Sequence, residues 1–279
     1  MTEIFRQVLV HLDASAGTTH RLWAARSIAR KHGSALRALY AVIPAYTGMP
    51  MTGLGMEFQS TLEQIDIDRR DAARKIFDEA ASAHGPTLTW SETTDESIIG
   101  AFVQQALYAD LLVLGQRNPS DPNAGDVPAD FAEAVVMTSG KPALVIPYAA
   151  PTDRIGDNVV IAWKASRESA RAVSASLPFL RTAAQVHIVS WSEPERAAVA
   201  GQALDLAEHL NLHGVKTTWH REPGEPAEVG ELLLSRAFDL DADLLVMGCY
   251  GHSRTRELLL GGATRTILQS MTLPVLMAH

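Results

Sequence analysis

The sequence predicts an α/β protein built from two doubly wound domains that follow one another in the chain. Three observations lead to this prediction. Short apolar runs typical of buried strands alternate with amphipathic helix patterns, as expected for parallel sheets covered by helices on both faces. The same series of elements occurs twice within the 279 residues. A chain of this length also accommodates about two domains of ordinary size.

The composition is that of a globular protein without membrane or nucleic-acid partners. Hydrophobic residues make up 47% and charged residues 20%, and the net charge of −8 argues against binding to DNA phosphates. No apolar run approaches the ~18 residues that a membrane helix needs, and the N-terminus lacks the layout of a signal peptide. The single cysteine, Cys249, fits a reducing compartment. We therefore expect a cytoplasmic protein.

The first half begins with an apolar run, residues 8–12, that ends in Asp13 and reads as a buried strand before a helix cap. A helix with an apolar face and a second strand, residues 35–42, follow. Residues 44–60 are rich in Gly, Pro and Met and are expected to form a long loop, as an insertion rather than a ligand lid. The later elements are a helix around 72–80, strand 88–90, a helix around 98–106, strand 111–114 and strand 143–146.

The second half repeats this series. Its strands are expected at 159–163, 185–191, 216–219, 244–247 and 274–277, and its helices around 170–177, 199–210 and 229–237. Each half thus predicts a five-stranded parallel sheet, and right-handed crossovers make it an open, doubly wound sheet. We place the domain boundary in the linker after residue 150, which gives domains 1–150 and 151–279.

Ligands of such sheets bind beyond the carboxyl ends of the strands, where the winding reverses. The first and fourth strands of each half flank that crevice. In the second half, a glycine loop begins there with Gly248 and Gly251 and ends at Gly261-Gly262 before a helix. Glycines let the backbone approach an anion closely, and the free N–H groups of a helix start point at it. This arrangement predicts an anion site.

The spacing G-x2-G-x9-G-G-x-T, with the words GHSRTRELLLGG and LPVLM, resembles the nucleotide loop of the universal stress protein family. The family usually has Ser or Thr directly after the third glycine, where this chain has Gly262, with Thr264 two residues later. The whole chain resembles a tandem member with adenine-nucleotide alpha hydrolase-like, Rossmann-like domains. Single-domain members commonly dimerise, so a tandem chain could pair its domains internally, and a homodimer stays open.

The resemblance implies an adenine nucleotide as cofactor: ATP, with ADP and AMP as alternatives and Mg²⁺ left open. It implies contacts to the base at Ala162, Trp163 and Val189. It implies contacts to the ribose and phosphates at Met247, Gly248, Gly251, His252, Gly261, Gly262, Ala263 and Thr264.

The first half departs from the family loop. Gly115 is followed by no second glycine, the prolines of residues 116–130 lack N–H donors, and Asp121, Asp126 and Asp130 would repel phosphate. We expect no ATP binding by the family's route there. Asp13 nevertheless matches the family's V-D-x-S motif, whereas the second half has Lys164 at this position. Either neither half binds nucleotide well, or Lys164 changes the preferred ligand.

No catalytic or metal site can be read from the sequence. His209 and His213 have a zinc-compatible spacing but no third ligand, His11 is expected in the core or the crevice, and Cys249 is expected to pack in the loop. Our leading hypothesis is a stress-response protein that binds nucleotide in its C-terminal domain and acts through unidentified protein partners. A slow ATP hydrolase and a nucleotide-free scaffold are the alternatives.

Overall fold

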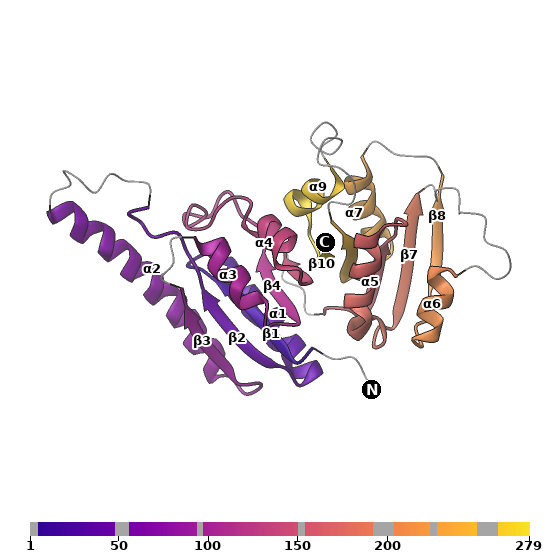
Figure 1. Ribbon diagram of the computed structural model, residues 1–279, viewed down its shortest axis with the longest axis horizontal. Coiled ribbons are helices and arrows are strands. Elements are labelled where there is room, and N and C mark those ends of the chain that lie inside the picture. Colours follow the sequence, from indigo (N-terminus) through magenta and orange to yellow (C-terminus); the bar gives the residue numbers. More distant parts are fainter. Residues whose placement is uncertain are drawn as a thin grey trace. The chain divides into compact units, whose positions relative to one another are not determined.

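The computed structural model describes residues 5–47, 56–93, 97–149, 154–191, 204–223, 228–249 and 262–279. These residues fall into two compact units, Phe5–Lys141 and Pro142–His279, and each unit is described by itself. Figure 1 shows strands and helices alternating along the chain in both. The predicted α/β class is confirmed. The predicted boundary after residue 150 falls beside residues outside the described ranges and stays a prediction.

The first unit has a parallel sheet with the strand order β3-β2-β1-β4. Its elements are β1 (Gln7–Leu12), α1 (Gly17–His32), β2 (Ala35–Tyr40), α2 (Met56–Ser82), β3 (Leu88–Glu92), α3 (Ile98–Ala106), β4 (Leu111–Gly115) and α4 (Phe131–Ser139). Strands β1 and β4 are buried almost throughout, as expected for central strands with both faces covered. They are neighbours, so the winding reverses between them.

The second unit repeats this plan and adds two strands, β5 and β10. Its elements are β5 (Ala143–Ile146), β6 (Asn158–Ala162), α5 (Arg167–Leu180), β7 (Gln185–Trp191), α6 (Leu206–Leu212), β8 (Thr218–Glu222), α7 (Val229–Asp239), β9 (Leu244–Gly248), α9 (Ala263–Ser270) and β10 (Val275–Ala278). The strand order is β5-β10-β9-β6-β7-β8, and the five strands from β10 to β8 are parallel. The predicted five-stranded sheet is present here.

The predicted strand at 143–146 is present as β5. It clusters with the second unit and pairs antiparallel with β10, with Leu144 opposite Leu276, which the sequence did not predict. All four residues of both strands are buried. An apolar edge strand exposes unpaired backbone groups, and the pairing of two such strands satisfies them.

The predicted loop 44–60 also needs correction. Helix α2 begins at Met56 and runs to Ser82, so the end of that segment is helical. Met, Glu and Gln near its start are good helix formers, and they outweigh the Gly- and Pro-rich residues before them. Residues 48–55 lie outside the described ranges.

Each unit has a carboxylate clamp of the same kind at the amino ends of its central strands. Asp110 accepts hydrogen bonds from the N–H groups of Arg6 (2.7 Å) and Gln7 (2.9 Å) at the start of β1. Asp243 accepts them from Gly156 (2.7 Å) and from Asp157 (3.0 Å), before β6. Each Asp directly precedes the strand that pairs with the strand it holds, so the clamp fixes the central pair at its start.

Candidate functional site

In the second unit, the carboxyl ends of β6 and β9 lie side by side. Ala162 is paired with Met247, and Gly248 follows at the end of β9. Val189 of β7 lies across from Ala162, and its carbonyl accepts a hydrogen bond from the Trp163 N–H at 2.8 Å. The structure therefore brings the predicted base-contact residues together. The Trp163 N–H already has a backbone partner, so base recognition would rely on other backbone groups.

Gly248 lies against the first turn of helix α5. A Cβ at this position would overlap the backbone of Glu168 and the N–H of Ser169. That turn is capped by Ser166, whose Oγ accepts a hydrogen bond from the Ser169 N–H at 3.2 Å. A glycine is thus required for β9 to end so close to the helix start.

Helix α9 begins at Ala263 after an N-cap glycine, Gly262, with extended backbone at ψ 148°. A glycine has no side chain to cap the helix, so the first-turn N–H groups face outward without a side-chain acceptor from that residue. Thr264 in this turn is buried. Close packing on α7 holds the helix, because a Cβ on Gly230 would lie 2.7 Å from the Cβ of Thr266.

Two charged groups stand near the end of β6. Lys164 is exposed, which leaves its ammonium group accessible. Glu168, which sequence reasoning did not single out, is 2% exposed and forms an ion pair with Arg167. Burial alone would raise the pKa of Glu168, but the hydrogen bond from Arg167 lowers it below its ordinary value. Glu168 therefore stays ionised in the crevice wall.

The remaining predicted site residues, Gly251, His252 and Gly261, lie outside the described ranges. Their role in ligand binding stays a prediction.

The equivalent crevice of the first unit contains a buried ion pair. Asp13, which resembles the family's adenosine-facing aspartate, lies 2.6 Å from Nη2 of Arg21, and both side chains are less than a tenth exposed. The Asp13 carboxylate also accepts hydrogen bonds from Ser15 Oγ (2.5 Å) and Thr18 Oγ1 (2.8 Å). Although burial opposes ionisation, Arg21 and these donors hold the pKa of Asp13 well below its usual range.

Arg21 lies across the carboxyl ends of the central strands of this unit, β1 and β4. Its Nε donates to the His11 carbonyl at 3.0 Å, and a Cβ on Gly115, at the end of β4, would overlap its guanidinium group. By strand register, Val8 opposes Leu111 and Val159 opposes Leu244. Counted from these registers, Arg21 corresponds to Ala172 in the second unit, whose methyl group cannot reach into the crevice as Arg21 does. An Arg on an amphipathic helix is usually on the solvent face, so the sequence carried no signal for this role.

The loop after β4 closes over the same crevice. The Asp121 carboxylate accepts a hydrogen bond from the Ala16 N–H at 3.0 Å, at the start of α1, and Asn123 Nδ2 donates to the Ala14 carbonyl at 2.9 Å. The Asp121 carboxylate thus accepts the hydrogen bond from a helix-start N–H group that an anionic ligand would need.

Two buried groups beside it have strongly shifted pKa values. Burial and the nearby Arg21 lower the pKa of His11 to about 4, although Asp13 opposes this shift, so the ring is neutral at pH 7. Its Nε2 lies 2.8 Å from the Ala41 carbonyl, which confirms the expected core or crevice position. Burial raises the pKa of Asp126 to about 6, despite an ion pair with Arg69 at 2.8 Å.

The other candidate residues have structural contacts. His209 and His213 pack edge to face with ring centroids 4.7 Å apart, and His213 Nδ1 lies 3.0 Å from Nη2 of Arg181. Cys249 is buried. Over the part of the chain that the structure describes, no group of three His, Cys, Asp or Glu side chains is placed to hold a metal ion. In the same residues, no helix is long and apolar enough to cross a membrane.

Comparison with known proteins agrees with this geometry. Residues 157–279 match the model of the universal stress protein family. None of the curated proteins matches the sequence. Among solved structures, a universal stress protein from Archaeoglobus fulgidus DSM 4304 is similar, with a TM-score of 0.67 at 16% identity over 98% of this chain and 95% of that one.

A protein of unknown function from Pseudomonas aeruginosa PAO1 is similar with a TM-score of 0.55, at 16% identity over 98% of this chain and 92% of that one. Identities this low concern the fold, which these proteins share along almost the whole chain. The sequence match is confined to the second unit, the half with the glycine loop. Residues 157–279 are therefore the part of the chain that matches the universal stress protein family.

Proposed function

We propose that the second unit binds an adenine nucleotide, ATP or its di- or monophosphate, at the carboxyl ends of β6 and β9. The single observation that carries the proposal is the position of Gly248. It ends β9 beside β6, at the point where the winding reverses, and it opens the glycine loop of the half that matches the family. Ligands of doubly wound sheets bind at this point.

The contrast between the two crevices supports the proposal. In the first unit, Arg21 fills the space that a nucleotide would use. Asp121 accepts the hydrogen bond from the helix-start N–H group that a phosphate would need. In the second unit the residue equivalent to Arg21 is Ala172, and Gly262 leaves the first turn of α9 without a side-chain cap. Nucleotide binding is therefore assigned to the second unit alone.

Lys164 is the residue that we expect to adapt the site. It is exposed directly after β6, where its ammonium group can pair with a phosphate oxygen. An aspartate at this position would repel the phosphate. We propose that the protein acts in a stress response, with partner proteins sensing whether nucleotide is bound.

Mass spectrometry of ligand extracted from the native protein, followed by calorimetric titration with ATP, ADP and AMP, tests the binding. We expect Gly262→Asp to weaken binding at least tenfold, because its carboxylate would stand at the start of α9. Gly125→Asp is the matched control, since a side chain on the exposed Gly125 meets no atom within 4 Å. If wild-type protein binds no nucleotide, or if both variants bind as wild type does, the proposed site is wrong.

A further inference from the structure

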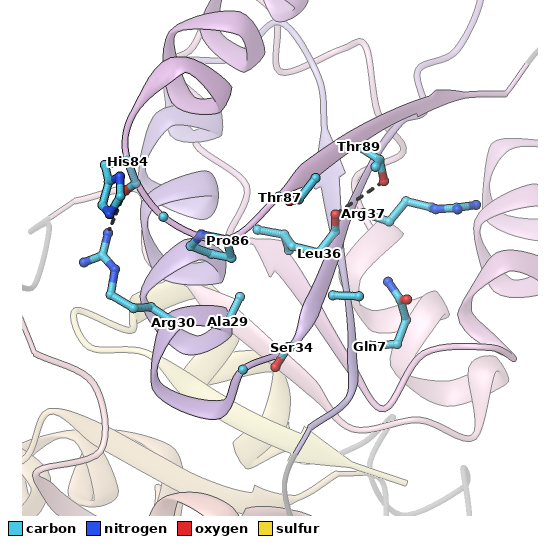
Figure 2. Close-up of a pocket in the computed structure, with 13 residues that line it drawn as sticks. Gln7, Ala29, Arg30, Ser34, Leu36, Arg37, His84, Pro86, Thr87 and Thr89 are labelled. Carbon is cyan, nitrogen blue, oxygen red and sulfur yellow. Dashed lines mark hydrogen bonds between the residues drawn. The ribbon is translucent and has the colours of Figure 1, made fainter.

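A groove of about 730 Å³ lies at the amino ends of β1, β2 and β3 in the first unit. Its walls come from the end of α1, the turn between α2 and β3, and the first residues of the strands (Figure 2). It is at the opposite edge of this sheet from the crevice that Arg21 fills. The volume is in the range of small-molecule sites.

The side chains that line the groove are rich in hydrogen-bond donors. Arg30, Arg37 and His84 contribute nitrogen donors, and Thr87 and Thr89 contribute hydroxyl groups. No carboxylate is among the lining residues, although the whole chain has a net charge of −8. The groove is thus suited to an anion.

Two guanidinium groups lie directly behind Gly85. A Cβ on this residue would be 3.0 Å from Nη2 of Arg26 and 3.4 Å from Nη2 of Arg30, and its φ of +148° also favours glycine. Arg26 Nη2 donates to the Ala83 carbonyl at 2.7 Å, whereas the bond from Arg30 Nη2 to the His84 carbonyl is long, at 3.5 Å. Arg30 is therefore weakly held and can turn toward a ligand.

Arg26 is only partly compensated, because its Nη2 donates to the carbonyls of Ala83 and His84 but no carboxylate neutralises it among the described residues. It is 7% exposed, and its Nη1 has no hydrogen-bond partner among the described residues. Within the same residues, no carboxylate forms an ion pair with Arg26 or Arg30. Burial and the charge of Arg30 lower the pKa of Arg26. Two cations that repel each other next to a groove favour an anion beside them.

We propose that this groove binds a phosphate dianion, as free phosphate or as a phosphate monoester, over Gly85, with Arg30 and His84 as donors and the buried Arg26 adding positive charge from behind Gly85. Two converging cations match one compact group with up to two negative charges and three acceptor oxygens, whereas a carboxylate carries only one charge. The inference is independent of nucleotide binding, which concerns the other unit.

Calorimetry on the full chain at ~150 mM salt, with inorganic phosphate and with ribose 5-phosphate, tests the proposal. Tighter binding of one probe identifies whether the ligand is the free ion or an ester. We expect Arg30→Gln to weaken binding about tenfold. Arg37→Gln makes the same charge change, but Arg37 points away from Arg30 and His84 (Figure 2), and we expect less than about a twofold effect.

Absence of binding to wild-type protein, or equal weakening by the two variants, would overturn the proposal. Loss of binding in Gly262→Asp would also overturn it, because the phosphate would then sit in the other unit. If Arg30→Gln does not fold, Arg30→Lys keeps the charge without the planar fork and should weaken binding in a folded protein.

Discussion

At the scale of the residue, Arg21 has the largest consequence for what the first unit can bind. Its guanidinium group neutralises Asp13 and takes the place between β1 and β4 where a ligand would lie. Asp13, the aspartate that the family resemblance links with adenosine, is thus held in a buried ion pair within the unit. A matching residue at one position does not establish a binding site when a neighbour on the next helix occupies it.

Arg21→Met should lower the free energy of unfolding by about 3 kcal/mol, because it leaves Asp13 buried without its cation. Urea denaturation measures this change. Arg74→Met removes a cation from an exposed pair with Asp78 and should cost less than about 1 kcal/mol. Equal costs for the two variants would show that Asp13 is not held as a buried ion pair.

The raised pKa of Asp126 predicts a pH effect on stability. Its folded-state pKa is about 6 against an ordinary value of 3.8, so the native protein binds this proton more tightly than the unfolded chain. Stability from this group therefore increases as pH falls through 6 and is complete below about 4.

The difference in unfolding free energy between wild type and Asp126→Asn isolates this effect, because His11 titrates in both proteins. Wild type should gain stability relative to the variant between pH 7 and pH 5. Wild type and the variant have the same charged groups around this position, namely Arg69, Asp13, Asp121 and Asp66. A difference that is constant with pH would contradict the assignment.

At the scale of the element, the contact between the end of β9 and the start of α5 positions the candidate site. Gly248→Ala would insert a methyl group into the backbone at Glu168 and Ser169. We expect a loss of about 1–3 kcal/mol in unfolding free energy, since backbone atoms cannot give way as a flexible side chain can. Gly125→Ala, with open space around it, should change stability by less than about 0.5 kcal/mol in the same chemical denaturation measurement.

The pairing of β5 with β10 bears on where the second unit begins. A fragment of residues 142–279 keeps β5 against β10, whereas a fragment of residues 151–279 leaves the edge of β10 bare. We expect the shorter fragment to be less stable and more prone to aggregation, measured by thermal unfolding and light scattering. Equal behaviour of the two fragments would favour the boundary after residue 150.

At the scale of the whole molecule, much of the architecture could be predicted from local patterns. The apolar runs and helix periodicities placed the strands and most helices, and the order of elements implied the crevice positions. The partner of β5 could not be predicted, because the direction of an edge strand depends on which other edge is available. The role of Arg21 could not be predicted either, because it depends on contacts between α1, β1 and β4 that no local pattern encodes.

The clamps formed by Asp110 and Asp243 explain how two units with the same framework can differ at their crevices. Both units hold the amino ends of their central strands by the same kind of hydrogen bond, so the sheet is stabilised at that edge. Mutations can then accumulate at the other edge without loosening the framework. The first unit fills its crevice with its own side chains, and the second unit is the one for which we propose a ligand.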